Sequence, residues 1–374
     1  MSSAPHLVDS PEFTTWLDGF RTWAAGAAED ERAWKSAGAQ GLFSLPLSAE
    51  RGGTGAGFLA GCIALEAMAD ATGRSGLPFA FSAHMWACQE PVAAFGDAAQ
   101  RSTWLTPLAA GTAVGAFAAT EYDAGSDLLS LATRATPRDD GGWTLDGAKT
   151  FVTNGPVADV FVVLARTAEG SALSGLSAFL IPRTTEGLGV GPAFEKAGLP
   201  GAHVGSLRLD DCSVPASAVL GPVGGGYAVL MRAMRYERAF ILAPVLGLMS
   251  HALRKAVEHV RTRSQFGSTL STYETIRQRL VRMHLSLTSA REVLVATARA
   301  ADRGELDHAR ASLTKLHVSN EFNAFCQELP DVYGGYALLP ETGAAHLMSD
   351  AIASRYYSGT SDMQMKIIAE GLGV

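Results

Sequence analysis

The segment Phe117-Ala-Ala-Thr-Glu-Tyr-Asp-Ala-Gly-Ser-Asp127 lies where the pattern of the chain changes. Before it, residues 10–112 carry apolar side chains at three- and four-residue spacing, as in FTTWLDGFRTWA, AWKSAGAQGLF and FLAGCIALEAMADA, which predicts helices. After it, up to about residue 220, short alternating or β-branched runs are separated by Gly, Pro, Asn and Asp, which predicts strands. The segment therefore marks the border between a helical and a β domain.

The predicted strands are WTLDGAKTFVT, ADVFVVLAR, GLSAFLIPR and VGSLRLDDCSVP. Beyond the glycine-rich joint GPVGGGY the helical pattern returns, over Val229 to Val260, Tyr273 to Asp302, His308 to Gln327 and a shorter C-terminal stretch. We expect an α+β protein with a helical domain over 1–116, a β-barrel or sandwich over 117–222 and a four-helix bundle over 223–374. This order differs from the alternating βαβ units of a nicotinamide-binding sheet.

Composition excludes several classes of protein. The 374 residues are 47% hydrophobic, which fits two or three folded units. A net charge of −7 without a basic stripe argues against nucleic acid binding. The four cysteines are scattered, as expected for reduced thiols, and the nine histidines lack metal-ligand spacing. The apolar run Ala239 to Met249 is shorter than the ~20 residues of a membrane span, and no signal peptide is evident. We therefore expect a cytoplasmic protein without metal or membrane anchor.

The border segment also has the composition of a binding loop. Together with Leu145 to Asn154 it offers hydroxyls, small residues and free backbone N–H groups at strand ends. A planar heteroaromatic with carbonyls and ring nitrogens, such as a flavin, requires such a surface. A β-bulge loop whose hydroxyls are internally satisfied would have the same composition, so the loop by itself leaves both interpretations open.

Five separated motifs in this chain resemble those of the acyl-CoA dehydrogenase family. They are TE-x-x-AGSD at Thr120 to Asp127, K-x-aromatic-ITN at Lys149 to Asn154, R-x-x-FG at Arg263 to Gly267, GG at Gly334 and Gly335, and EGT, which stands here as Ser358-Gly359-Thr360. The resemblance implies an N-terminal helical domain, a central β domain and a C-terminal four-helix bundle. It also implies FAD between the last two domains and a homodimer or homotetramer.

The resemblance assigns residues to the cofactor. On the flavin ring and ribityl side it places Phe117, Ala119, Thr120 and Ser126, with Phe151 stacking near the ring and Thr153 donating toward it. From the partner subunit it brings Arg263, Gln265, Phe266 and Leu270 to the pyrophosphate and adenosine. The remaining assignments are Asp331, Gly334, Gly335, Thr360 and Asp362. Taken alone, Arg263 would be interpreted as an exposed helix charge, and Asp331 replaces the usual Gln beside a diphosphate, where a further acid is unfavourable.

The catalytic base requires a different residue from the usual one. In much of the family the base is the Glu of EGT, but Ser358 occupies that position, and a serine hydroxyl has no useful basicity at neutral pH. Glu237, on the first bundle helix, matches the position that supplies the base in the isovaleryl and long-chain types. The alternative is an ordinary helix Glu paired with an Arg. We expect Glu237 to remove the α-proton of an acyl thioester while the β-hydrogen leaves as hydride, giving an enoyl thioester.

The residues around the two ends of the pocket suggest a branch of the family. Tyr236 to Phe240 and Tyr357 to Gln364 look most like enzymes acting on carrier-protein-bound acyl groups in secondary metabolism, such as prolyl-carrier-protein oxidases and dehydrogenases for polyketide extender units. Short or medium acyl groups on a carrier protein or on CoA are the expected substrates. The substrate residues would be Ser126, Arg238, Tyr357 and Ser358. Arg232, Arg235 and Arg238 would either face an acidic carrier or form salt bridges in the core.

Two other functions remain open. One is a flavin-dependent oxidase or monooxygenase of the same fold, which differs in the electron acceptor for reduced flavin. The other is a non-catalytic partner subunit, suggested by the missing EGT carboxylate and by Asp331.

Overall fold

The computed structural model describes residues 7–27, 32–168 and 174–374. The N-terminal part is helical, as predicted, and its first three segments of apolar spacing form α1, α2 and α3. The helices are α1 (Pro11–Ala25), α2 (Arg32–Ala39), α3 (Phe58–Thr72), α4 (Gly76–Ala83), the π-helical turn η4 (His84–Gln89), α5 (Glu90–Phe95), α6 (Ala98–Gln100), the π-helical turn η5 (Arg101–Leu105) and α7 (Thr106–Ala109).

The helical region from α4 to α7 was not predicted as separate elements. Pro91 and Pro107 would be expected to interrupt a helix, but the residue before α5, Gln89, and the residue before α7, Leu105, are themselves helical, so the chain stays helical through both prolines. The π-helical turns η4 and η5 directly precede these two helices. A wider turn lets the chain continue in one direction around a residue that cannot donate.

The middle of the chain forms one connected eight-stranded sheet, which confirms the predicted β domain. Its path is β6-β7-β3-β2-β4-β5-β8, and β1 pairs in parallel with β4. The four predicted strands correspond to β3, β4, β5 and β7. The strands are β1 (Gly115–Ala118), β2 (Arg134–Pro137), β3 (Trp143–Thr153), β4 (Val160–Arg166), β5 (Leu176–Pro182), β6 (Leu188–Val190), β7 (Val204–Val214) and β8 (Val219–Leu220).

The C-terminal part is a helical bundle closed by two short helices. The elements are α8 (Gly226–Phe240), α9 (Ala243–Thr262), the β9–β10 hairpin (Ser264–Gln265 and Ser268–Thr269), α10 (Glu274–Asp302), α11 (His308–Tyr333), α12 (Ala344–Ala353) and α13 (Ser361–Leu372). The single helix predicted over Val229 to Val260 was wrong, because the helix is interrupted after Phe240 and resumes with Pro244 in its first turn. The predicted C-terminal stretch is two helices instead of one.

Helix α8 joins the sheet to the bundle. It packs on β5 and α5 at one end and on α11 along its length. It can start so close to the sheet because Gly226 lies where a Cβ would meet the backbone of Ser177 at 2.7 Å. The stretch Gly226–Thr262 is apolar and long enough to cross a membrane by composition, but 67% of its apolar window is buried inside the protein. We interpret it as two successive core helices of the bundle, α8 and α9.

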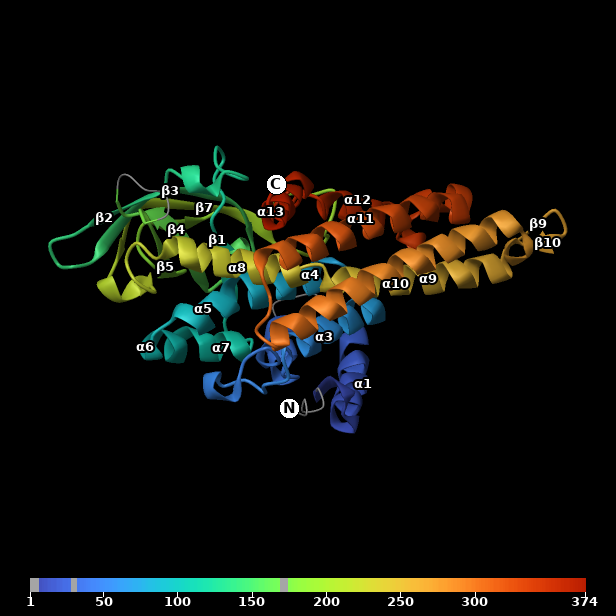
Figure 1. Ribbon diagram of the computed structural model, residues 1–374, viewed down its shortest axis with the longest axis horizontal. Helices are drawn as coiled ribbons and strands as arrows, with labels where there is room; N and C mark the ends of the chain where they lie inside the picture. The colour runs from blue at the N-terminus through green and yellow to red at the C-terminus, as the bar shows by residue number, and fades with distance from the viewer. Residues whose placement is uncertain (1–6, 28–31, 169–173) are drawn as a thin grey trace.

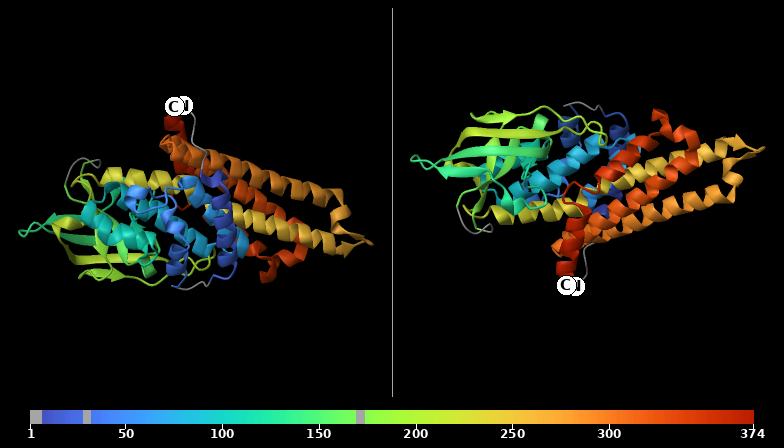
Figure 2. Two further views of the ribbon diagram at one scale, coloured as in Figure 1. Left: turned by 90° about the horizontal axis from the view of Figure 1, so that it is seen from below. Right: turned by 90° about the horizontal axis from the view of Figure 1, so that it is seen from above.

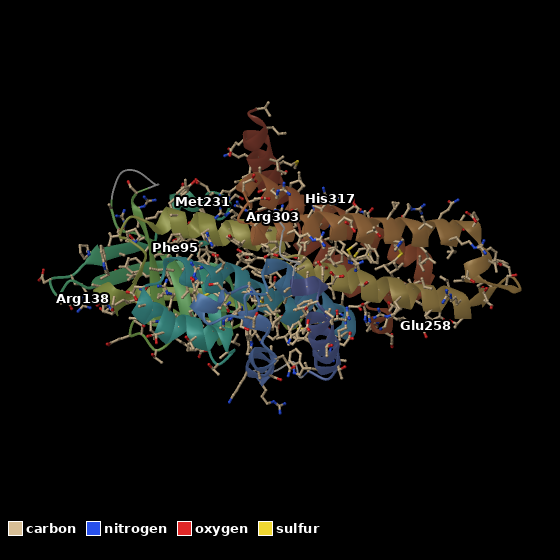
Figure 3. All side chains as sticks on the ribbon, turned by 60° about the horizontal axis from the view of Figure 1, so that its bottom comes forward. Phe95, Arg138, Met231, Glu258, Arg303 and His317 are labelled. Carbon is tan, nitrogen blue, oxygen red and sulfur yellow. The ribbon has the colours of Figure 1, made fainter. Side chains whose placement is uncertain are left out.

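The molecule is elongated, with the sheet at one end and the β9–β10 hairpin at the other (Figures 1 and 2). Figure 3 labels Arg138, in the β2–β3 turn, and Glu258, on α9, toward these opposite ends. Helix α13 lies near the middle, beside α11. Residues of α8 and α13 can therefore share a site, whereas the β9–β10 hairpin lies far from the sheet of its own chain.

Candidate active site

The carboxylate of Glu237 and the hydroxyl of Ser358 meet in the middle of the molecule. Ser358 Oγ donates a hydrogen bond to Glu237 Oε1 at 2.9 Å, although the two residues are 121 positions apart. Glu237 lies one turn before the end of α8, and Ser358 lies in the turn that precedes α13. The structure thus brings together the two residues that the sequence singled out for the base.

The environment of Glu237 is poorly solvated. Burial raises the pKa of Glu237 above its usual value, while the hydrogen bond from Ser358 and the charges of Arg238 and Lys315 oppose the rise. A carboxylate with a raised pKa binds a proton more readily near neutral pH than an exposed one does. The site can therefore accept a proton from a weakly acidic carbon.

The turn that carries Ser358 has unusual backbone geometry. Ser358 has φ 56° and Gly359 has φ 93°, both in the left-handed region. A Cβ on Gly359 would lie 2.8 Å from Gln364 Nε2, so glycine is required for both conformation and space. Thr360 then caps α13, because its side chain accepts a hydrogen bond from Met363 N at 3.3 Å.

Three polar side chains donate to the carbonyl oxygens of this turn. Gln364 Nε2 donates to Ser358 O at 3.2 Å and to Gly359 O at 2.9 Å, and Arg238 Nε donates to Ser358 O at 3.4 Å. Lys315 Nζ donates to Gly359 O at 2.8 Å. Sequence reasoning missed Lys315 and Gln364. Lys315 was detectable, because it lies on the apolar stripe of α11 between Ala311 and Val318.

Tyr357 lies on the other side of the turn. Its ring packs against Phe79 with a centroid distance of 4.8 Å, and burial raises its pKa well above the usual value. Both rings line a cavity of about 10 Å³, together with Ile241 and Pro244. The cavity has room for roughly one water molecule and is too small for an acyl group.

The TE-x-x-AGSD and K-x-F-V-T-N motifs build the loop at the sheet end. Lys149 Nζ forms a buried ion pair with Glu121 Oε1 at 2.7 Å, and Thr133 and the Ala132 amide also donate to the Glu121 carboxylate. Burial alone would raise the pKa of Glu121, but Lys149 and these donors hold it below its usual value. Burial lowers the pKa of Lys149 to about 8. These charged motif residues therefore hold the loop in place.

The surface beside this loop fits a flat heteroaromatic group. Phe151 has φ 52°, and its side chain is 69% exposed although it follows the buried Thr150. Thr150 Oγ1 is buried without a hydrogen-bond partner among the described residues. Phe117, Thr120 and Thr153 are half-buried, Ala119 is buried and Ser126 is exposed at the same edge of the sheet. An exposed ring beside half-buried threonine hydroxyls suits the isoalloxazine of FAD.

The remaining predicted cofactor residues form a second group at the far end of the bundle. Phe266 is 96% exposed with φ 50°, at the tip of the β9–β10 hairpin, and Arg263 stacks over the Tyr336 ring at 5.3 Å. Gly334 has φ 59° and follows α11 at this end. The group also contains Gln265, Leu270, Asp331 and Gly335.

In the structure, Asp331 and Arg232 have ion-pair partners that the sequence did not identify. Asp331, the acid that replaces the usual Gln, is neutralised by Arg279, with Nη1 to Oδ2 at 2.6 Å. Arg232 forms an ion pair with the buried Glu90 and stacks over the Tyr236 ring at 4.7 Å, and Arg238 is 7% exposed. Of the two interpretations left open for these arginines, core pairing holds for Arg232, and Arg238 is buried. Asp362 is exposed in the first turn of α13.

The chain belongs to the acyl-CoA dehydrogenase family. Sequence models of the family match over all three regions: the N-terminal domain over residues 18–112, the middle domain over 116–212 and the C-terminal domain over 224–373. Among similar proteins is the L-prolyl-[peptidyl-carrier protein] dehydrogenase of Pseudomonas fluorescens, 37% identical over 341 residues, which cover 91% of this chain and 90% of that protein.

Solved structures share the whole fold. The prolyl acyl carrier protein oxidase AnaB has a TM-score of 0.93 and 32% identity, covering 98% of this chain and 100% of that one. The FAD complex of PigA has a TM-score of 0.92 and 30% identity, covering 97% and 98%. The predicted α+β fold and its family are therefore confirmed.

Proposed function

We propose that this enzyme dehydrogenates a short acyl thioester on the phosphopantetheine arm of a carrier protein or CoA, with FAD as cofactor and Glu237 as the base. One observation carries the proposal. The Glu237 carboxylate is hydrogen-bonded to Ser358, 2.9 Å away, at the turn where most of the family carries its catalytic carboxylate. The Glu237 carboxylate, carried by α8, therefore lies beside the turn that no longer supplies a carboxylate of its own.

In this proposal Glu237 takes the α-proton of the thioester and becomes a neutral carboxylic acid. Its raised pKa, caused by burial, favours that product. The backbone N–H of Ser358 donates to no acceptor among the described residues, and we assign it to the thioester carbonyl oxygen, where negative charge develops. FAD, when bound, accepts the β-hydrogen together with its electron pair.

The two groups of cofactor residues point to a shared site between subunits. The sheet-end residues would hold the flavin, and the hairpin group, Arg263 to Leu270, would hold the pyrophosphate and adenosine. Because these groups lie at opposite ends of one chain, we assign the hairpin to a neighbouring copy in a homodimer or homotetramer (Figure 1). The nearly complete exposure of Phe266 supports this assignment.

The substitution Glu237→Gln tests the proposed base. We expect the variant to retain bound FAD and its melting temperature but to lose substrate-dependent flavin bleaching by ~100-fold or more. The exposed Glu292 on α10 provides a matched control, and Glu292→Gln should bleach at the wild-type rate. Unchanged bleaching in Glu237→Gln would remove Glu237 as the base, and a chain that never bleaches with any substrate would favour the non-catalytic subunit.

The substrate to test first is a prolyl thioester, because the similar P. fluorescens enzyme and AnaB are named for prolyl carrier proteins. Matched prolyl-carrier and prolyl-CoA substrates, compared by mass spectrometry of the products, separate the two tethers. We place the enzyme in the secondary metabolism of carrier-bound acyl groups in the cytoplasm, such as polyketide biosynthesis. Faster turnover of the CoA thioester than of the carrier thioester would count against that role.

An oxidase is the second candidate. The similar P. fluorescens protein is named a dehydrogenase and AnaB is named an oxidase. The names of both proteins refer to a prolyl group on a carrier protein. The two activities differ in what reoxidises the reduced flavin. Mixing the substrate-reduced enzyme with air-saturated buffer decides between them, since reoxidation within a turnover time indicates an oxidase and slow reoxidation indicates a separate protein acceptor.

A further inference from the structure

Lys315 is buried next to the turn that carries Ser358. Lys315 is 0% exposed, and its Nζ donates to Gly359 O at 2.8 Å. No carboxylate oxygen lies within 4.0 Å of this ammonium in the part of the chain that the structure describes. Lys149, the other fully buried lysine of the described core, has Glu121 at 2.7 Å. A buried ammonium without an adjacent carboxylate is costly, so its placement needs a reason.

The contacts of Lys315 lead to Glu237 through the turn. Gly359 O accepts from Lys315 and from Gln364, and Ser358 O accepts from Gln364 and from Arg238. Four donor contacts therefore fix two successive carbonyls of a left-handed backbone. With both carbonyls held, the Ser358 side chain and N–H have one orientation, in which the hydroxyl donates to Glu237.

We propose that Lys315 is a positioning residue for the base: by holding the Gly359 carbonyl, it keeps the Ser358 hydroxyl on the Glu237 carboxylate. This inference rests on the proposed function, in which Glu237 removes the α-proton. Lys315 itself touches neither Glu237 at hydrogen-bond distance nor, in the proposal, the substrate. It acts through the turn and through its charge.

The charge of Lys315 supplies a second effect that can be measured separately. The groups that face Glu237 are Arg238 on its own helix, Lys315 from α11, and Ser358 and Tyr357 from the turn before α13. Arg238 and Lys315 both lower the pKa of Glu237, against the effect of burial. Burial lowers the pKa of Lys315 to about 7, assisted by Arg238 and Arg355 and opposed by Glu237. Below that pH Lys315 is charged and favours the carboxylate form of Glu237.

Two substitutions separate the hydrogen bond from the charge. Lys315→Met removes both, whereas Lys315→Gln keeps a donor for the Gly359 carbonyl without the charge. Both should move the acidic limb of the pH profile of flavin bleaching to higher pH, because the carboxylate form of Glu237 loses a favourable charge. Lys315→Met should also lower the limiting rate above that limb by about tenfold or more, since the turn is less well held. Lys315→Gln should keep that rate within about threefold.

The experiment uses the FAD-loaded enzyme, with FAD absorbance and melting temperature recorded for each variant. Lys35→Met, on the exposed side of α2, is the control and should match the wild type. If Lys315→Met does not fold, the test rests on Lys315→Gln, in which the acidic limb of the pH profile of flavin bleaching should move to higher pH.

The outcomes separate this inference from the function on which it rests. Suppose that Glu237→Gln abolishes bleaching but the Lys315 variants keep the wild-type limiting rate and the wild-type pH profile. The positioning role of Lys315 is then wrong, and Glu237 remains the proposed base. If the limiting rate of the Lys315 variants falls but the acidic limb of their pH profile does not move, Lys315 has only a general structural role. The inference is then also wrong. If Glu237→Gln bleaches normally, both proposals fail.

Discussion

At the scale of single residues, the main feature of the proposed function is that Ser358 and Glu237 divide a task usually given to one carboxylate. Ser358 keeps the left-handed turn, and we propose that Glu237 supplies the basic oxygen from the facing helix, where its carboxylate accepts from Ser358 Oγ. The hydroxyl is short enough to leave room for the carboxylate of α8 and still donate to it. In this proposal the serine at 358 holds the base in position instead of removing function from the site.

Ser358→Ala tests this division. The variant removes one hydrogen bond to the carboxylate, so the pKa of Glu237 should rise further and the acidic limb of flavin bleaching should move to higher pH. The limiting rate above that limb should stay within about tenfold of the wild-type rate, because the carboxylate is less firmly oriented but becomes a stronger base when it loses one donor. The measurement is the bleaching rate between pH 5 and 9. A loss of bleaching at every pH would instead make Ser358 the essential group.

Part of this site could be predicted from the sequence. A serine in place of the EGT carboxylate, with Glu237 at the alternative position, predicted that two residues 121 apart would share one site. Lys315 and Gln364 were not predicted, because their role is to bind backbone carbonyls whose positions only the folded turn defines. The exposed ring of Phe151 was expected on the cofactor, but its left-handed φ has no signature in a Lys-Thr-Phe-Val run.

At the scale of elements, alternation predicted long strands and failed on short ones. β3, β4, β5 and β7 span seven to eleven residues and show period two or continuous burial. β1, β2, β6 and β8 span two to four residues, too few for a period to be visible, and they exist because neighbouring strands offer free backbone groups. The break after Phe240 was likewise concealed by a run that is apolar on all sides.

The π-helical turn η4 contains a histidine that links helix α7 to strand β1. His84 is 0% exposed, its Nδ1 accepts from Gly115 N at 3.0 Å on β1, and Nε2 lies 3.2 Å from Leu108 O on α7. With Nδ1 accepting, the proton of the neutral ring resides on Nε2 and is donated to Leu108. A second proton would remove the acceptor for Gly115.

This arrangement predicts acid sensitivity. Burial lowers the pKa of His84 from 6.5 to about 4, so the unfolded chain takes up a proton in that interval while the folded chain does not. The stability due to neutral His84 is present above pH 6.5 and is lost as the pH falls toward 4, by up to roughly 3 kcal/mol. His84→Gln should be less stable than the wild type at pH 7, and this difference should shrink by pH 4.5. Urea unfolding at both pH values measures it, and a constant difference would contradict the prediction.

At the scale of the whole molecule, the separation of the sheet from the β9–β10 hairpin predicts sites built from two chains. A mixture of two inactive variants tests this directly. One chain carries Glu237→Gln with an intact hairpin, and the other carries Arg263→Ala and Phe266→Ala with an intact base. A mixed dimer then contains one site with both an intact base and an intact hairpin.

Co-expression of the two chains with different affinity tags isolates the mixed dimer. We expect flavin bleaching in about half of its sites at most, against almost none in either parent, because binding determinants from both subunits are then complete in one site. FAD content of the hairpin variant alone should be low. Failure of the mixed dimer to bleach, with normal assembly, would contradict a site shared between chains, because each hairpin would then serve the site of its own chain. Normal bleaching by the hairpin variant alone would place the hairpin outside the site.

Glu237 lies three residues before the end of α8, the helix that packs on the sheet and on the bundle together. A base on a loop near the chain terminus can be adjusted by changing a few neighbouring residues. The position of the proposed base depends on how the sheet and the bundle pack against each other. If Glu237 is the base, substitutions at the remote contacts between β5 and α8 should alter the rate of proton removal without changing the pocket. Evolution or engineering of this enzyme therefore has a route to new rates through the domain interface, while the residues that face the substrate stay the same.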